Sequence, residues 1–202
     1  MAPNTHTRED RPGMNTMNKT YPNPFVASHW LLALLVIAAA ALGWYMVDIP
    51  QRTPERAYFF NLHKSFGLLA LIMILLLTMQ RRRFSPPPLP ATLPPWQHRA
   101  AAWGHLAMYL LLLGSALSGY VGTNFSRWGI DFFGLFSLPS WGPENREAYQ
   151  FLKIVHIWTT NLLAALVALH VAAVIKHAVH GEGVLRRMWF RHPVPGRSAD
   201  AE

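Results

Sequence analysis

Four long stretches without a charged residue dominate the pattern of hydrophobic and polar positions. They cover residues 26–47, 66–79, 100–125 and 155–175. Three of them are long enough for a helix to cross a hydrocarbon core of about 30 Å, and the second is long enough if its helix starts near Asn61. A soluble four-helix protein would show polar positions at every third or fourth residue, and these stretches do not. The pattern predicts an all-α membrane protein with a bundle of four transmembrane helices.

Charged residues lie almost entirely between these stretches, and their signs are unevenly distributed. The two loops that follow the first and third stretches carry nearly equal numbers of positive and negative residues. The segments on the other side of the predicted membrane are strongly basic: Arg8, Arg11, Lys19, Arg81, Arg82, Arg83, Arg99, Lys176, Arg186, Arg187, Arg191 and Arg197. Positive residues favour the cytoplasmic side, so we expect both termini in the cytoplasm of a multi-pass membrane protein. The net charge of +8 then reflects topology and contact with membrane lipid, and no nucleic acid partner is expected.

Three regions are predicted from this topology. Residues 1–24 are expected to form a disordered cytoplasmic tail, residues 25–182 the four-helix domain, and residues 183–202 a basic cytoplasmic tail. The first stretch resembles a secretory signal, but its apolar run continues to residue 47 and favours a retained helix. The aromatic loop at 123–153 is expected to lie in the headgroup region; the alternatives are a lid over a cofactor or a docking surface.

Topology also sorts the histidines by depth. Because successive helices alternate in direction, His63 and His156 are predicted near the outer face, and His29, His105 and His170 near the inner face. His156 and His170 are fourteen residues apart on one predicted helix. This spacing corresponds to a rise of about 21 Å, with both side chains on nearly the same face. The sequence therefore predicts two levels of histidines.

The histidines point to a particular cofactor chemistry. A single interfacial histidine can be a hydrogen-bonded packing residue, but pairing at two depths favours a functional site. Zinc and copper sites would usually include carboxylates or sulfur, whereas the four stretches contain no Asp or Glu and the chain contains no Cys. Haem iron needs only two axial imidazoles and apolar walls. The absence of Cys excludes covalent c-type haem, iron–sulfur clusters held by thiolates, and disulfides.

Short motifs open the predicted helices. They are Ser28-His29-Trp30, then Leu62-His63-Lys64-Ser65-Phe66-Gly67, then Gly104-His105, with His156 and His170 in the fourth. In order and spacing they resemble the bacterial cytochrome b561 family over residues 25–189. The resemblance implies two non-covalent b haems in a protein of the bacterial inner (cytoplasmic) membrane. By position, His63 and His156 would ligate the outer haem iron, and His29 and His170 the inner one.

Three further residues are expected to contact the haems or their partners. His105 would bond a propionate, line a quinone pocket, or replace His29 or His170 as an axial ligand. Arg82 belongs to a run of arginines that orients the second helix, and it is the candidate in that run for an inner propionate. Lys64 would contact an outer propionate or attract a small anion.

The function implied is transmembrane electron transfer in a respiratory chain, exchanging electrons with ubiquinone. One activity of the family is that of a superoxide:ubiquinone oxidoreductase, which would make this protein a quinone-linked enzyme; no catalytic residue is assigned. The alternative is a membrane-anchor subunit that links a periplasmic redox protein, a dehydrogenase or a hydrogenase, to the quinone pool. A third alternative, from a different class, is a haem-free transporter or structural membrane bundle.

Overall fold

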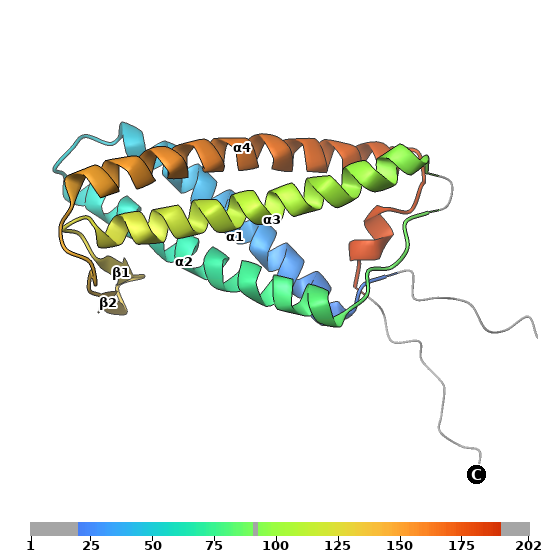
Figure 1. The fold of residues 1–202 in the computed structure, drawn as a ribbon, viewed down its shortest axis with the longest axis horizontal. Coiled ribbons are helices and arrows are strands. Elements are labelled where there is room, and N and C mark those ends of the chain that lie inside the picture. Colours follow the sequence, from blue (N-terminus) through green and yellow to red (C-terminus); the bar gives the residue numbers. More distant parts are fainter. Residues whose placement is uncertain (1–19, 91–92, 191–202) are drawn as a thin grey trace, which may run out of the picture.

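A computed structural model describes residues 20–90 and 93–190. Its four long helices are α1 (Asn23–Asp48), α2 (Pro54–Arg83), α3 (Pro95–Asn124) and α4 (Arg146–Val179) (Figure 1). A small hairpin of β1 (Ile130–Phe132) and β2 (Phe136–Leu138) lies between α3 and α4, and a short 3₁₀ helix, η1 (Leu185–Met188), follows α4. The all-α four-helix prediction is therefore confirmed. The predictions for residues 1–19 and 191–202 lie outside the described residues.

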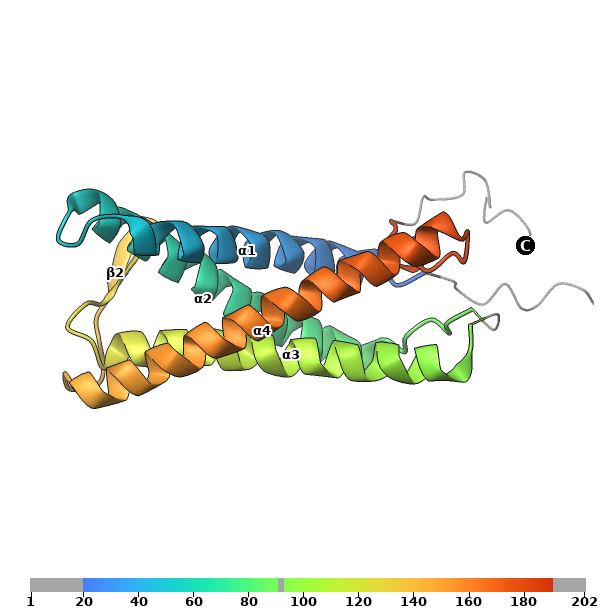
Figure 2. The same ribbon diagram turned by 90° about the horizontal axis from the view of Figure 1, so that it is seen from above.

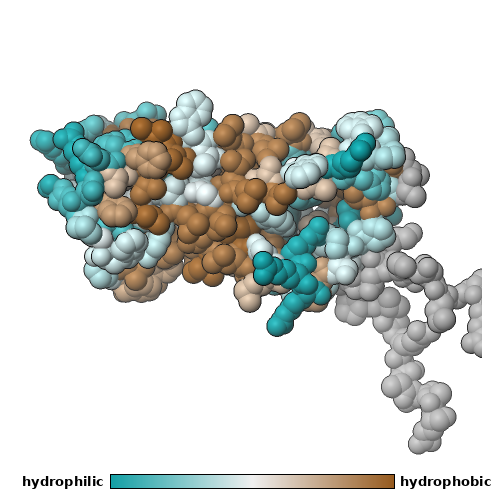
Figure 3. Space-filling model, viewed as in Figure 1, coloured by the Kyte–Doolittle hydropathy of each residue, from teal (hydrophilic) through white to brown (hydrophobic). Residues whose placement is uncertain are grey.

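All four helices are long and apolar enough to cross a membrane. The longest, α4, has 34 residues. At 1.5 Å per residue it extends about 50 Å, which exceeds a hydrocarbon core of about 30 Å. Large apolar side chains are exposed along the bundle, and the space-filling view shows an apolar middle between two polar ends (Figure 3). The chain is a multi-pass membrane protein.

The bundle has two distinct ends. We call the end near the first and last described residues the terminal end, and the end with β1 and β2 the hairpin end (Figure 1). α1 and α3 run from the terminal end to the hairpin end, and α2 and α4 run back. α1 packs on α2, α2 on α3 and α3 on α4, while α4 lies obliquely across the bundle (Figure 2).

Prolines and side-chain caps determine where the helices begin and end. Pro54 occupies the first turn of α2, and the hydroxyl of Thr53 accepts a hydrogen bond from the Arg56 amide at 3.2 Å. At the start of α4, the side-chain oxygen of Asn145 accepts from the Ala148 amide at 3.0 Å. The Arg56 guanidinium donates to the Met46 and Val47 carbonyls at 3.1 Å each. These carbonyls have no partner within α1, so Arg56 joins α1 firmly to α2.

The aromatic loop between α3 and α4 is a folded hairpin attached to α2. β1 and β2 pair antiparallel, with Phe132 opposite Phe136. The fully buried Ser65 of α2 accepts a hydrogen bond from the Phe133 amide at 3.0 Å, and it donates to the Asn61 carbonyl at 2.9 Å. The attachment also stabilises Phe133 in a left-handed conformation with φ of 50°. The hairpin is thereby attached to α2 two residues after His63.

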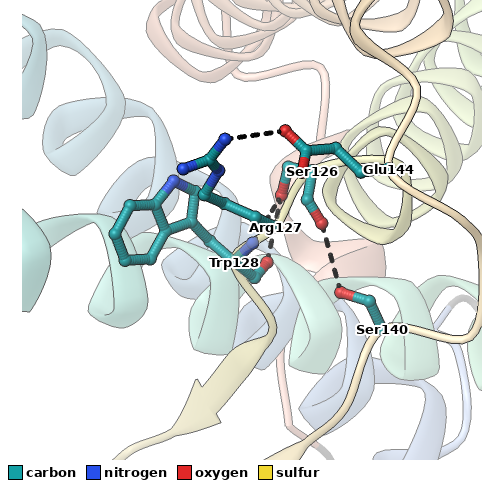
Figure 4. Close-up of polar contacts among 5 residues, drawn as sticks. All are labelled: Ser126, Arg127, Trp128, Ser140 and Glu144. Atoms are coloured by element: carbon teal, nitrogen blue, oxygen red, sulfur yellow. Dashed lines mark hydrogen bonds and ion pairs between the residues drawn. The ribbon is translucent and has the colours of Figure 1, made fainter.

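The base of this loop is closed by polar contacts (Figure 4). Arg127 and Glu144 form an exposed ion pair at 3.0 Å, and the Ser140 hydroxyl donates to the Ser126 carbonyl at 3.4 Å. An exposed pair of this kind contributes little to stability by itself. It does join the part of the loop that leaves α3 to the part that approaches α4.

The segment after α4 folds back across the terminal end. The Tyr21 amide donates to the Arg187 carbonyl and the Trp30 indole to the Met188 carbonyl, each at 3.0 Å. Tyr21 is only 5% exposed and stacks on Phe25. Sequence reasoning placed Tyr21 and residues 183–189 in the tails because their local composition is polar or basic. In the structure they belong to the folded body.

Candidate functional site

At the hairpin end, His63 of α2 and His156 of α4 form what we call the hairpin-end pair. Their ring centroids are 5.9 Å apart and the planes lie at 84°. The Nδ1 of His63 lies 2.9 Å from the Ala39 carbonyl of α1, and the Nδ1 of His156 lies 2.8 Å from the Ser115 carbonyl of α3. A carbonyl can only accept, so each Nδ1 carries the proton and donates. The Nε2 of each ring is left as an electron-pair donor for a metal.

Two glycines make these hydrogen bonds possible. In a helix, the carbonyls of Ala39 and Ser115 face the residues four positions later, which are Gly43 and Gly119. A Cβ at Gly43 would lie 3.2 Å from the His63 ring, and one at Gly119 would lie 3.0 Å from the His156 ring. Any larger residue would therefore push the imidazole away from its carbonyl. The sequence analysis did not identify this role. A glycine inside a helix predicted to pack beside a histidine ligand would have been the signal for it.

Around His156 the hydrogen bonds extend further. The Ser115 hydroxyl lies 2.6 Å from the Thr160 hydroxyl, and the Ser118 hydroxyl donates to the Ser115 carbonyl at 3.0 Å. Ser115 and Ser118 are both buried. The carbonyl that orients His156 is therefore itself fixed by buried polar groups on α3 and α4, which restricts the ring to one orientation.

At the terminal end, His29, His105 and His170 come together from α1, α3 and α4. We call them the terminal-end group. The rings of His105 and His170 are 5.4 Å apart, with their planes at 73°, and His29 lies close enough to interact electrostatically with both. The Nδ1 of His105 donates to the Ala101 carbonyl of its own helix at 2.6 Å. The Nδ1 of His29 is buried and has no hydrogen-bond partner. A buried nitrogen without a partner is unfavourable unless the ring binds something else.

The remaining candidates lie at the ends of the bundle. The Lys64 ammonium donates to the Gly129 carbonyl at 2.9 Å, so it helps to hold the hairpin beside His63. Arg82 is exposed in the last turn of α2, whereas its neighbour Arg81 is partly buried and donates to the Tyr21 hydroxyl. Arg187 of η1 also faces Tyr21. Sequence reasoning missed Arg187, because only the folding back of residues 183–189 brings it there.

The hairpin-end pair has the spacing of two axial ligands of haem iron. Two imidazoles on opposite sides of one metal, with metal–nitrogen bonds of about 2 Å, have centroids roughly 6 Å apart. The hairpin-end pair shows 5.9 Å. Gly67 follows His63 by one turn and Gly104 precedes His105, and a Cβ at either would meet no atom within 4 Å. These backbone faces can be approached by a flat macrocycle. Within residues 20–90 and 93–190, no three His, Asp or Glu side chains are arranged to hold a metal ion by themselves.

Comparisons with known proteins agree with this chemistry. The family model described as prokaryotic cytochrome b561 matches residues 20–191. Cytochrome b561 homolog 2 of Escherichia coli K12 is 34% identical over 170 residues, which cover 80% of this chain and 87% of that protein. Cytochrome b561 homolog 1 of the same organism is 28% identical over 88% of this chain and 99% of its own length. A probable superoxide oxidase, CybB, of Yersinia pestis is 27% identical over 85% of this chain and 97% of its own length. The chain belongs to the prokaryotic cytochrome b561 family, which implies haem b as its cofactor.

Proposed function

We propose that this protein transfers electrons across the membrane with two b haems. His63 and His156 would be the axial ligands at the hairpin end, and His29 and His170 those at the terminal end. The observation that carries the proposal is the hairpin-end pair, in which both rings are anchored through Nδ1 and their centroids lie 5.9 Å apart. When bound, haem iron supplies one-electron oxidation and reduction.

The protein's own contribution is orientation and depth. Donation from Nδ1 to a carbonyl makes each imidazole a better electron donor, which favours the oxidised iron. The separation of fourteen positions between His156 and His170 corresponds to about 21 Å between the two levels along α4. Apolar helices surround both levels and exclude water, so the surrounding dielectric constant is low. The asymmetric distribution of arginine and lysine supports a cytoplasmic terminal end and a periplasmic hairpin end.

For the electron partners we propose superoxide at the hairpin end and ubiquinone as the acceptor. The relative from Yersinia pestis bears the name of a superoxide oxidase. Lys64 places a cation next to His63, which suits a small anion. A hollow of ≈ 470 Å³, lined by Asn61, Arg127 and Asp131 among others, lies between α2 and the loop. It offers a small molecule an approach to this end of the bundle.

A membrane-anchor subunit is the second candidate. Its support is the loop at the hairpin end, where Trp128 is 69% exposed, Trp141 62% and Leu135 77%. Such a surface suits contact with a periplasmic dehydrogenase or hydrogenase. A large subunit that copurifies in fixed stoichiometry would favour this candidate. Superoxide-dependent reduction of ubiquinone by the protein purified alone would favour the oxidase.

The decisive test is a reduced-minus-oxidised absorption spectrum of the detergent-purified chain, with haem quantified per polypeptide. We expect a b-type spectrum and two haems per chain. One haem per chain would show that only one of the two levels of histidines binds haem. A chain purified from haem-replete cells without a b-type band would overturn the proposal and leave a transporter or structural bundle as the better explanation.

Gly119→Ala is expected to weaken the binding of haem at the hairpin end. The added methyl would lie 3.0 Å from the His156 ring, so the ring must move and lose its bond to the Ser115 carbonyl. Losing such a supporting hydrogen bond typically lowers metal affinity about 10- to 100-fold. Haem retention during dilution in detergent measures the effect. Gly114→Ala is the matched control, because its methyl would meet only Thr159, at an ordinary 3.9 Å. Equal retention in the two variants would contradict the proposed role of Gly119.

A further inference from the structure

Two guanidinium groups face the same tyrosine at the terminal end. Arg81 comes from the last turn of α2 and Arg187 from η1. Their Cζ atoms lie 5.7 and 5.8 Å from the centroid of the Tyr21 ring, and Arg81 also donates to the Tyr21 hydroxyl. Tyr21 is buried, so both cations are held at the edge of the packed interior rather than extended into water.

Neither guanidinium has an anionic partner in the described part of the chain. The ion pairs there join Arg127 to Glu144 and His177 to Glu182. Arg187 donates to the Pro87 carbonyl, but its Nε is buried and has no hydrogen-bond partner. Burial lowers the pKa of Arg187; Tyr21 opposes this shift and Arg81 adds to it. An arginine nevertheless stays charged at physiological pH. Two partly buried cations with an unused donor are unfavourable unless an anion joins them.

The two cations lie beside the terminal-end group of histidines. Both Arg81 and Arg187 interact electrostatically with His105, whose ring contacts that of His170. Tyr109, one turn after His105, interacts with Arg81 and Tyr21. An anion held by the two arginines would therefore lie within reach of a ligand bound at His170.

We propose that Arg81 and Arg187 form a carboxylate-binding site that holds a propionate of the haem at the terminal end. This inference rests on the proposed function. The planar fork of a guanidinium matches a carboxylate and forms short, charge-assisted hydrogen bonds. Because η1 carries Arg187 and is tied to Tyr21 and Trp30, the segment after α4 acts as a strap that closes over the cofactor.

The experiment compares haem with its dimethyl ester, which lacks the propionate charges. The full-length chain, produced without haem, is loaded with either compound in phospholipid-free detergent, and transfer of haem to excess apomyoglobin is timed. With haem, Arg187→Gln is expected to speed the loss of one of the two haems about tenfold. With the ester, the unchanged protein should already lose that haem quickly, and Arg187→Gln should add little. Arg81→Gln should behave in the same way, and Arg187→Lys should give a smaller effect.

The exposed neighbour Arg186→Gln is the matched control, since it removes one positive charge next to the site. The propionate site is overturned if Arg187→Gln loses haem no faster than Arg186→Gln. It is also overturned if Arg187→Gln speeds the loss of haem and of the ester by the same factor. In both cases the two-haem function stands. If Arg187→Gln changes haem loss only when phospholipid is added, the propionate site is overturned and the two arginines bind a lipid phosphate instead. Failure of the unchanged chain to bind any haem would overturn the proposed function, and this inference with it.

Discussion

His156→Ala is expected to leave one haem per chain instead of two and to abolish electron transfer across the membrane. An alanine cannot coordinate iron, and the ring of the proposed opposite ligand, His63, is held by a single carbonyl on α1. The terminal-end group lies about 21 Å away along α4, so its haem should keep its spectrum and potential. Haem quantified per chain, together with a potentiometric titration, measures both effects.

The control for this prediction is His177→Ala on the same helix. His177 contacts Glu182 at the end of α4 and belongs to neither group of histidines, so both haems should remain. His63→Ala should reproduce the loss seen for His156→Ala. The double variant should be no worse than either single variant, because two ligands of one iron act as a unit and their effects do not add. Two haems retained in His156→Ala would show that His156 is a packing residue.

The sequence was sufficient to predict the helices and the depth of each histidine. Charge-free stretches follow directly from the cost of placing charges in hydrocarbon, and alternating helix direction then assigns each histidine to a level. His63 and His156 are separated by 93 positions, yet their common depth follows from topology alone. Depth does not specify rotation about a helix axis. Only the structure therefore shows which carbonyls of α1 and α3 accept the Nδ1 protons of His63 and His156.

The contacts at the two ends depend on tertiary packing that local composition does not report. Trp30 and Met188 are 158 positions apart, and their hydrogen bond exists because the chain after α4 turns back. A basic segment is explained equally well by membrane topology, so its charges alone could not indicate that Arg187 faces Tyr21. In the same way, the aromatic loop allowed three interpretations. The hydrogen bonds of Ser65 determine that it folds as a hairpin on α2.

At the terminal end, His170→Ala and His29→Ala are each expected to remove the second haem, while His105→Ala retains it. In the proposed function, three imidazoles would compete there for two axial positions. His170 contacts His105 and interacts with His29, so it is part of either possible pair. The expectation for His29 rests on its position in the cytochrome b561 pattern, because its buried Nδ1 has no partner and would still need one with iron at Nε2. His105 donates from Nδ1 to the Ala101 carbonyl and keeps its Nε2 free, as the hairpin-end histidines do, so it is the competing candidate ligand.

The three variants separate the possible ligand pairs when haem per chain and the spectrum of the remaining haem are measured together. Loss of a haem in His29→Ala, with two haems in His105→Ala, would support ligation by His29 and His170. The reverse result would assign the iron to His105 and His170, the pair whose rings are in contact. A shift of the second haem's potential in His105→Ala, without haem loss, would place His105 as a positioning residue. Its effect should then disappear in the His170→Ala background, because a residue that acts through a haem cannot influence a chain that has lost it.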